Sequence, residues 1–429
     1  MARPELMAIG DSIYNGVRSL TISRDLAAHA VPLQVARAFN WPFIAPDYPR
    51  PILEDIEQSL FRHPLTGLLE LTAHARANGA AWLAPGPWSA HARFDNLSIA
   101  QQTVADITRA NAADALATAR QLLAPGRQLA LADLATLYQA LNTAFILNPA
   151  RTPGDSRNAV AILAEAQPRR IAINIGINDG LWELALMGDA TDYRARIDPT
   201  VAMAGLARAL ADQCDNTEHF YINLLPKPSA LANLMPRMDD VAPEDGYFDH
   251  YLGRRIQSGG IDGATMREVD EFVDTDLNPR IRQAFAALAD RAHFVDLYAT
   301  TAAYDRKNRI ATRSVNVHGT NGEMLLDNVP LEAFPFVGSL KQGGLFGLDN
   351  LHPTIPGYGV LAQAVCDVIA ATEGLPAPVI DQQACYAADT LLQNLSGAIE
   401  LSDFAFSFVG AFIPPTGTST GTSQRVGEA

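Results

Sequence analysis

Short apolar runs alternate with longer stretches of helical periodicity along most of this chain. The runs that indicate β-strands are residues 6–9, 94–99, 170–175, 219–225 and 293–297. Helical periodicity follows most of them, and the last clear helix begins near Pro356, where apolar residues recur at spacings of three and four. Alternating strands and helices predict the α/β class, with a parallel sheet covered by helices on both faces.

Two stretches interrupt this alternation. Residues 110–165 indicate a mostly helical segment, and residues 226–348 combine a loop rich in Pro, Asp and Gly with a helix over residues 264–291. We expect both to be large, mostly helical insertions in one domain of residues 1–375, at loop ends where lids and substrate walls tend to lie. Residues 376–429 would form a C-terminal extension, and the Gly-, Ser- and Thr-rich residues 416–429 are expected to be disordered.

Composition narrows the function classes. The chain has 429 residues, 48% of them hydrophobic, which is enough for a large buried core. Its formal net charge of -15 argues against a nucleic-acid partner, because nucleic-acid binding needs a basic face. Three cysteines at wide spacing suggest neither a disulfide framework nor a zinc site. No signal peptide and no transmembrane run is visible, so the expected location is the cytoplasm by default.

A candidate nucleophile follows the first predicted strand, in Gly10-Asp11-Ser12. Glycine permits a tight turn that lifts a serine hydroxyl above the strand tips, where backbone N–H groups can face a developing oxyanion. A serine hydroxyl is a poor nucleophile until a base removes its proton, so Ser12 needs a histidine. The alternative for an isolated Gly-Asp-Ser is a turn residue or a helix cap.

A candidate acid–base pair lies just before the last helix. Asp349 and His352 are close enough in sequence for one turn of backbone to place both side chains on one side of the loop. The carboxylate can then orient the imidazole and stabilise its charged form. The order Ser, Asp, His along the chain occurs in one group of serine hydrolases. The alternative is that Asp349 caps a turn and that His352 is a surface residue.

A candidate oxyanion donor follows the third predicted strand, in Gly176-Ile177-Asn178-Asp179. An asparagine amide at a strand tip can donate a hydrogen bond to an oxyanion. The alternative is an Asx-turn, in which Asn178 shapes only the loop. We expect Asp179 to hold this loop or cap the next helix rather than to transfer protons.

Together these motifs resemble the SGNH (GDSL-type) hydrolase superfamily. The resemblance implies a flavodoxin-like three-layer sandwich around five parallel strands, and ester hydrolysis that needs no metal or cofactor. By position it implies that Ser12 is the nucleophile, that His352 is the base and that Asp349 is its partner. It also implies an oxyanion hole of Ser12, Gln101 and Asn178. Gln101 stands where the family has glycine, in the stretch Asn96-Leu97-Ser98-Ile99-Ala100-Gln101-Gln102.

The sequence therefore predicts a serine-dependent carboxylic ester hydrolase acting on a small-molecule ester, with a lipid-like ester among the options. Two alternatives remain open at this point. The same site suits an acyltransferase or a carbohydrate O-acetylesterase, and a binding protein on a hydrolase scaffold belongs to a different class. The oligomeric state is not indicated by the sequence.

Overall fold

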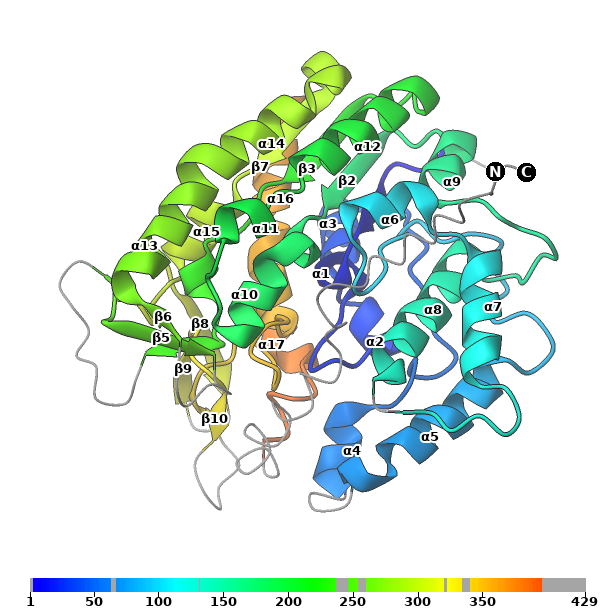
Figure 1. Cartoon of the computed structure of the whole chain (residues 1–429). Helices are drawn as coiled ribbons and strands as arrows, with labels where there is room; N and C mark the ends of the chain where they lie inside the picture. The colour runs from blue at the N-terminus through cyan, green and yellow to red at the C-terminus, as the bar shows by residue number, and fades with distance from the viewer. Residues whose placement is uncertain are drawn as a thin grey trace, which may run out of the picture.

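The computed structural model describes residues 3–62, 67–130, 132–236, 246–253, 260–319, 322–333 and 340–395. A parallel sheet lies at its centre, with helices on both sides (Figure 1). The strands follow one another in the order β1 (Met7–Gly10), β2 (Arg170–Asn174), β3 (His219–Asn223) and β7 (Ala292–Val295). The α/β class and four of the five expected strands are confirmed. The disorder expected for residues 416–429 concerns a segment outside the described residues.

The fifth expected strand, residues 94–99, lies along the free edge of β1. Ala8 N donates to Asp95 O at 2.8 Å, and Leu97 N and Ile99 N donate to β1 carbonyls at 2.8 and 2.9 Å. Only the pair Ala8 and Asn96 forms a bridge. The Asn96 side chain accepts from Ser98 N, whose N–H points away from β1, since the neighbouring N–H groups of Leu97 and Ile99 face β1. The central sheet of the described residues therefore has four strands.

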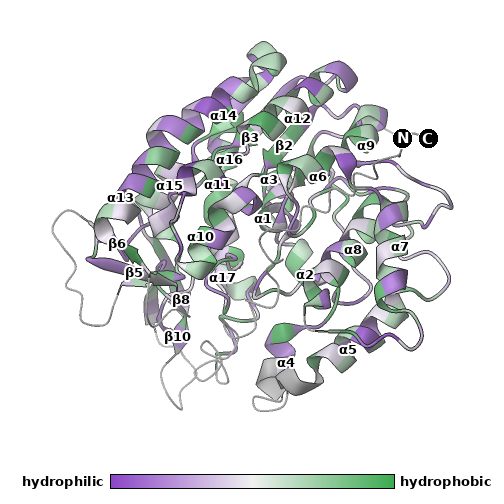
Figure 2. Ribbon diagram, in the orientation of Figure 1, coloured by the Kyte–Doolittle hydropathy of each residue, from purple (hydrophilic) through white to green (hydrophobic). Residues whose placement is uncertain are grey.

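Side chains alternate between the two faces of the sheet along each strand, and this gives the protein two hydrophobic cores. Met7 and Ile9 of β1 belong to one buried cluster, whereas Ala8 belongs to another, because successive strand residues face opposite sides of a sheet. Helices α9 (Ala159–Ala166), α12 (Thr200–Gln213) and α14 (Asn278–Ala284) supply the first cluster. The second contains residues of α3 (Val31–Ala38) and α16 (Ile355–Glu373). Figure 2 shows β2 and β3 as largely hydrophobic, while hydrophilic residues band the outer helices α13 and α14.

Helix α16 begins at Ile355, as the position of Pro356 predicts, with Thr354 as its N-cap. Among the residues that the structure describes, it is the one helix long and apolar enough to cross a membrane. Within the protein, 61% of its apolar stretch is buried, against α3, β3 and β7. Its apolar stripe therefore serves the second core.

The first insertion is helical, as expected. It contains α7 (Ala112–Leu122), α8 (Asp133–Leu147) and α9. Helices α7 and α8 pack against each other, and α8 also contacts α5 (Gly67–Trp82), which follows α4 (Ile56–Arg62). In Figure 1 these four helices form a lobe beside the central sheet. Trp82 is buried in this lobe with Phe145 of α8.

The second insertion differs from the expectation of a mostly helical segment. Besides β7 it carries three small antiparallel sheets, which lie at the lower left of Figure 1. Short runs of alternating burial, such as Val315–Gly319, pair as hairpins rather than coil into helices. Its strands are β4 (Leu234–Pro236), β5 (His250–Gly253), β6 (Ile261–Asp262), β8 (Val315–Gly319), β9 (Gly322–Leu326), β10 (Glu332–Ala333) and β11 (Leu340–Gln342).

The helix expected over residues 264–291 is present as a series of connected segments. They are α13 (Gly263–Glu271), a π-helical turn at Phe272–Leu277, α14 and a 3₁₀ segment at Ala286–Arg291. The shorter helices of the described chain are α1 (Ser12–Asn15), α2 (Arg24–Ala27), α6 (Val104–Arg109), α10 (Trp182–Met187), α11 (Tyr193–Arg196), α15 (Leu297–Ala303) and α17 (Gln382–Ala388).

Candidate active site

Ser12 lies at the carboxyl end of β1, where the chain turns directly into α1. A side chain at Gly10 would place its Cβ 2.4 Å from the Asn174 carbonyl oxygen, so glycine is required for β1 and β2 to approach here. The Asp11 carboxylate caps α1 by accepting the Ile13 N–H at 3.0 Å. Ser12 is the first residue of α1, so its N–H has no partner within the helix.

Polar side chains at the ends of three strands bond to one another. Asn174 Nδ2 donates to Asp11 Oδ1, and Asn223 Nδ2 donates to Asn174 Oδ1, both at 2.9 Å. Burial raises the pKa of Asp11 to about 7, although the bonds from Ile13 and Asn174 and the charge of His352 oppose that shift. The strand ends next to Ser12 are therefore tied together by a carboxylate and two amides.

Asp349 and His352 are in direct contact. His352 Nδ1 lies 2.6 Å from Asp349 Oδ2, and the other carboxylate oxygen accepts the backbone N–H groups of Leu351 and His352. Leu20 N also donates to Asp349 Oδ2, at 3.0 Å. Burial opposes ionisation of Asp349, but the charge of His352 and these hydrogen bonds hold its pKa below the usual value.

The second imidazole nitrogen has a different environment. His352 is 3% exposed, and its Nε2 has no hydrogen-bond partner among the residues that the structure describes. The ring packs against Trp182, with ring centroids 5.0 Å apart. Since Asp349 occupies Nδ1, Nε2 is the nitrogen that remains to exchange a proton with a substrate or a nucleophile.

Gln101 has a left-handed backbone, with φ of 63°. This conformation is uncommon for residues other than glycine, which explains why a glycine would suit the position. The preceding residue is held by Asn142 of α8, whose Oδ1 accepts the Ala100 N–H at 2.8 Å. The loop thus keeps the conformation that a glycine would adopt, although a glutamine occupies it.

Asn178 lies in a tight turn after β2. Gly176 has φ of 113°, and a Cβ there would lie 2.7 Å from Met203, so this position also needs glycine. Asn178 Nδ2 donates to the Gln102 carbonyl at 2.9 Å, which leaves its second amide hydrogen for another acceptor. Asp179 accepts the Val104 N–H at 3.2 Å and so joins this turn to the Gln101 loop. Burial raises the pKa of Asp179 to about 6.

One small cavity, which we call the Ser12 pocket, gathers these residues. Ser12, Gln101, Asn178 and His352 all line it, although they come from positions far apart in the sequence. Asp349 lies directly behind His352. The cavity measures about 20 Å³, which is room for roughly one water molecule. Of the five residues that the sequence singled out, four share this cavity and the fifth contacts one of them.

The sequence patterns did not single out several other residues of this region. Val17, Leu20, Tyr138 and Trp182 complete the walls of the Ser12 pocket. Trp182 follows the Gly-Ile-Asn-Asp motif within one turn, and that proximity was the available signal. Val17 and Leu20 follow Ser12 within eight residues, whereas Tyr138 comes from α8, and no local pattern points to it.

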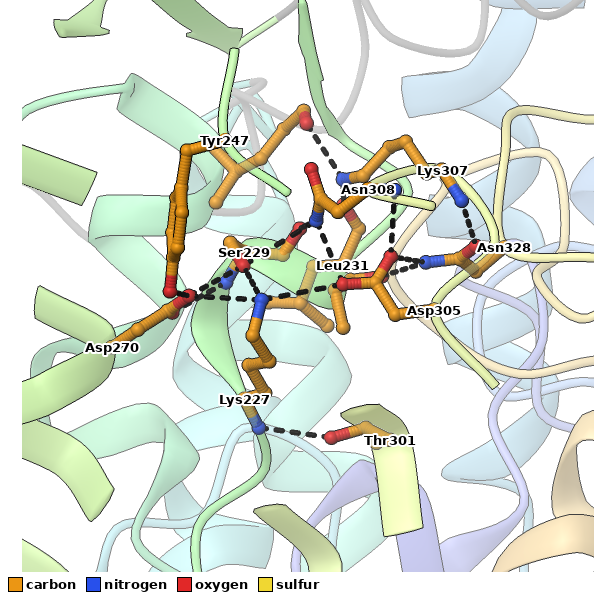
Figure 3. Close-up of polar contacts among 12 residues, drawn as sticks. Lys227, Ser229, Leu231, Tyr247, Asp270, Thr301, Asp305, Lys307, Asn308 and Asn328 are labelled. Atoms are coloured by element: carbon orange, nitrogen blue, oxygen red, sulfur yellow. Dashed lines mark hydrogen bonds and ion pairs between the residues drawn. The ribbon is translucent and has the colours of Figure 1, made fainter. Parts of the chain in front are cut away.

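A second group of polar residues, the Lys227 cluster, is buried in the second insertion (Figure 3). Lys227 Nζ lies 3.0 Å from Asp270 and 3.3 Å from Asp305, and it also donates to Ser229. Lys307 Nζ donates to two backbone carbonyls, and burial lowers its pKa to about 7. The cluster consists of Lys227, Ser229, Asp270, Asp305, Lys307, Asn308 and Asn328.

No family model, no curated protein and no solved structure matches this chain. The functional argument therefore depends on the geometry of the site. Within the described residues, no three His, Cys, Asp or Glu side chains converge as metal ligands. The three cysteines are buried and unpaired with one another.

Proposed function

We propose that this protein is a serine-dependent carboxylic ester hydrolase that forms an acyl-enzyme on Ser12. The observation that carries the proposal is the environment of His352. Its Nδ1 is held by a buried carboxylate, and its Nε2 has no partner among the described residues, in a cavity that Ser12 also lines. An unpaired buried nitrogen costs stability, so a purely structural histidine is the poorer explanation.

In the first half-reaction, His352 Nε2 removes the hydroxyl proton as Ser12 Oγ attacks the ester carbonyl carbon. The carbonyl oxygen becomes an oxyanion, which the N–H groups of Ser12 and Gln101 and the free amide hydrogen of Asn178 would stabilise. When the tetrahedral intermediate collapses, the ester C–O bond breaks. His352 then gives its proton to the departing alcohol, and the acyl group remains on Ser12.

In the second half-reaction, His352 removes a proton from water, which attacks the acyl carbon. Collapse releases the carboxylic acid and returns the proton to Ser12 Oγ. The Asp349 carboxylate stabilises the imidazolium in both halves and stays ionised, because its pKa is held low. This cycle needs only residues of the chain and water.

We also propose membership of the SGNH superfamily and a five-stranded flavodoxin-like core. Supporting this, residues 95–99 bond to the outer edge of β1. Counting that segment as a strand gives the order 2-1-3-4-5 along the chain, which is the flavodoxin order. In such sheets the ligand site lies beyond the carboxyl ends of the strands, as Ser12 and Asn178 do here.

Substitution of Ser12 is the direct test. Ser12→Ala is expected to abolish hydrolysis of p-nitrophenyl acetate, with a loss of roughly 10³-fold or more, while the far-UV spectrum and Tm stay the same. Ser89→Ala is the matched control, since Ser89 is equally buried but lies outside the Ser12 pocket. A fluorophosphonate should modify Ser12 in the wild-type protein and nothing in Ser12→Ala.

The outcomes separate the candidate functions. Full activity in Ser12→Ala would refute the proposed mechanism. Absence of both turnover and adduct would favour a binding protein on a hydrolase scaffold. Adduct formation with transfer of the acyl group to added alcohols or sugars in preference to water would instead identify an acyltransferase.

A further inference from the structure

A second cavity, the apolar pocket, lies beside the Ser12 pocket. It measures about 90 Å³, and its surface is almost entirely apolar. Its walls come from the turns after β1 and β2, from the loop before α16 and α16 itself, and from the second insertion. Ile13, Ile177, Leu231, Leu351 and Val360 are among the lining residues.

Sequence neighbours show how close the two cavities are. Ser12 lines the Ser12 pocket while Ile13 lines the apolar pocket, and Asn178 and Ile177 are divided in the same way. His352 lines the Ser12 pocket, and both of its chain neighbours line the apolar pocket. Trp182 lines both cavities, and its ring contacts the His352 ring. The apolar space is therefore next to the candidate nucleophile and its base.

The Lys227 cluster engages polar groups along one wall of the apolar pocket. Lys227, Thr301 and Asn328 line that wall, yet their polar groups are bonded within the protein. Asn328 Nδ2 donates to Asp305 and to the Ala230 carbonyl, and its Oδ1 accepts the Lys307 N–H (Figure 3). A cavity wall whose polar groups are bonded within the protein offers water few partners and favours an apolar occupant.

We propose that the apolar pocket binds the aliphatic chain of the acyl group, while its carbonyl lies in the Ser12 pocket, with Trp182 lining the path of the chain in both cavities. This assignment rests on the proposed function, because it needs an ester carbonyl at Ser12. It specifies the substrate class: esters of unbranched aliphatic acids rather than acetylated sugars, whose acyl group has no chain to bury.

The cavity volume limits the chain length. An apolar cavity of about 150 Å³ accommodates benzene, so about 90 Å³ holds roughly four carbon atoms. The carbonyl carbon and its neighbour would lie in the Ser12 pocket. We therefore expect the preferred acyl group to have about four to six carbons by the same estimate.

Filling the apolar pocket tests the assignment. Each buried methylene changes kcat/KM by about fourfold, so wild-type protein should prefer p-nitrophenyl hexanoate to the acetate by roughly 10-fold or more. Ala230→Phe and Val360→Phe place a ring in the pocket from two different elements, the second insertion and α16. Each is expected to lower the hexanoate-to-acetate ratio of kcat/KM by about 10-fold. Two variants are used so that misfolding of one does not decide the result.

Ala113→Phe on α7 is the matched control, because the same substitution there borders a different cavity. It should leave the hexanoate-to-acetate ratio at the wild-type value. A second readout needs no turnover: calorimetry should detect hexanoate binding to Ser12→Ala, and binding should weaken about 10-fold in Ser12→Ala combined with Ala230→Phe.

The possible failures are distinguishable. Ester hydrolysis with a ratio that neither filling variant alters would overturn the acyl pocket and leave the proposed function intact. Absence of hydrolysis and of a fluorophosphonate adduct would overturn the proposed function, and the acyl assignment with it. A lower ratio in both filling variants, together with weaker hexanoate binding, would support the assignment.

Discussion

At the scale of single residues, backbone conformation and side-chain bonding determine what the site can do. The Asp349 carboxylate accepts hydrogen bonds from Leu20, Leu351 and His352, which fixes both its position and that of the imidazole. Gln101 holds a left-handed backbone that costs roughly 1 kcal/mol for a residue other than glycine. Strain of this kind tends to persist where function requires the conformation.

The proposed oxyanion hole predicts different sensitivities at its two loop positions. Asn178→Ala removes a side-chain donor and should lower kcat by about 10²–10³-fold. Gln101→Ala and Gln101→Gly keep the backbone N–H, so both should stay within roughly threefold of wild type in kcat. Steady-state kinetics on one short ester checks all three variants. If both Gln101 variants lose activity as Asn178→Ala does, the glutamine side chain is the donor.

At the scale of elements, the junctions between strands and helices carry the site. The junction of β1 and α1 contains Asp11, which caps the helix and accepts from Asn174 at the end of β2. The loop before α16 brings His352 to the same edge of the sheet. Because parallel strands end at a common edge, two β–α turns and one late loop can meet around one cavity.

The Asp11 junction should make stability depend on pH. The folded-state pKa of about 7 exceeds the usual 3.8, so the folded protein retains a proton that the unfolded chain loses between pH 4 and 7. The contribution of this group is fully present below about pH 4 and is lost as the pH rises through 7. Asp11→Asn cannot titrate, so its free energy of unfolding minus that of wild type should rise by up to about 4 kcal/mol over this range.

Urea unfolding at several pH values measures this difference. Asp189→Asn is a useful control, because Asp189 is exposed and its pKa is lowered, so its variant should show a small change of the opposite sign. If the free energy of unfolding of Asp11→Asn minus that of wild type stays constant from pH 4 to 7, the raised pKa of Asp11 is contradicted.

At the scale of the whole molecule, the second insertion and the parallel sheet share one site. The Lys227 cluster joins residues between positions 227 and 328. Two of its members, Lys227 and Asn328, also line the apolar pocket, and the lining residue Thr301 accepts a hydrogen bond from Lys227 N. Within the cluster the positive charge of Lys227 faces Asp270 and Asp305, all three almost fully buried. Buried charges are tolerated only when they are paired and hydrogen-bonded.

Removal of one charge should therefore be far more costly inside the cluster than on the surface. Lys227→Met leaves two buried carboxylates without their cation and is expected to destabilise the protein by about 3–5 kcal/mol. Arg280→Met breaks an ion pair with Asp198 that is about one-third exposed, and it should cost about 0–1 kcal/mol. Equal shifts of the urea midpoint in the two variants would show that the cluster does not anchor the insertion.

Local patterns in the sequence determined the positions of the candidate chemistry. Ser12 and Asn178 follow strands that the pattern and composition of apolar residues indicate by themselves. Asp349 and His352 lie just before a helix whose start is marked by Pro356. These features depend on neighbours in the chain, which a sequence displays directly. Four of the expected strands, the helical first insertion and the start of α16 followed from the same local information.

Tertiary structure alone decided the features that depend on distant packing. The incomplete pairing of residues 94–99, the hairpins of the second insertion and the left-handed Gln101 have no local signature. Likewise, Trp182 lines two cavities, and the Lys227 cluster forms, only because segments far apart in sequence are brought together. Periodicity reports which side of an element is buried, whereas the identity of the residues opposite is set by how the elements pack.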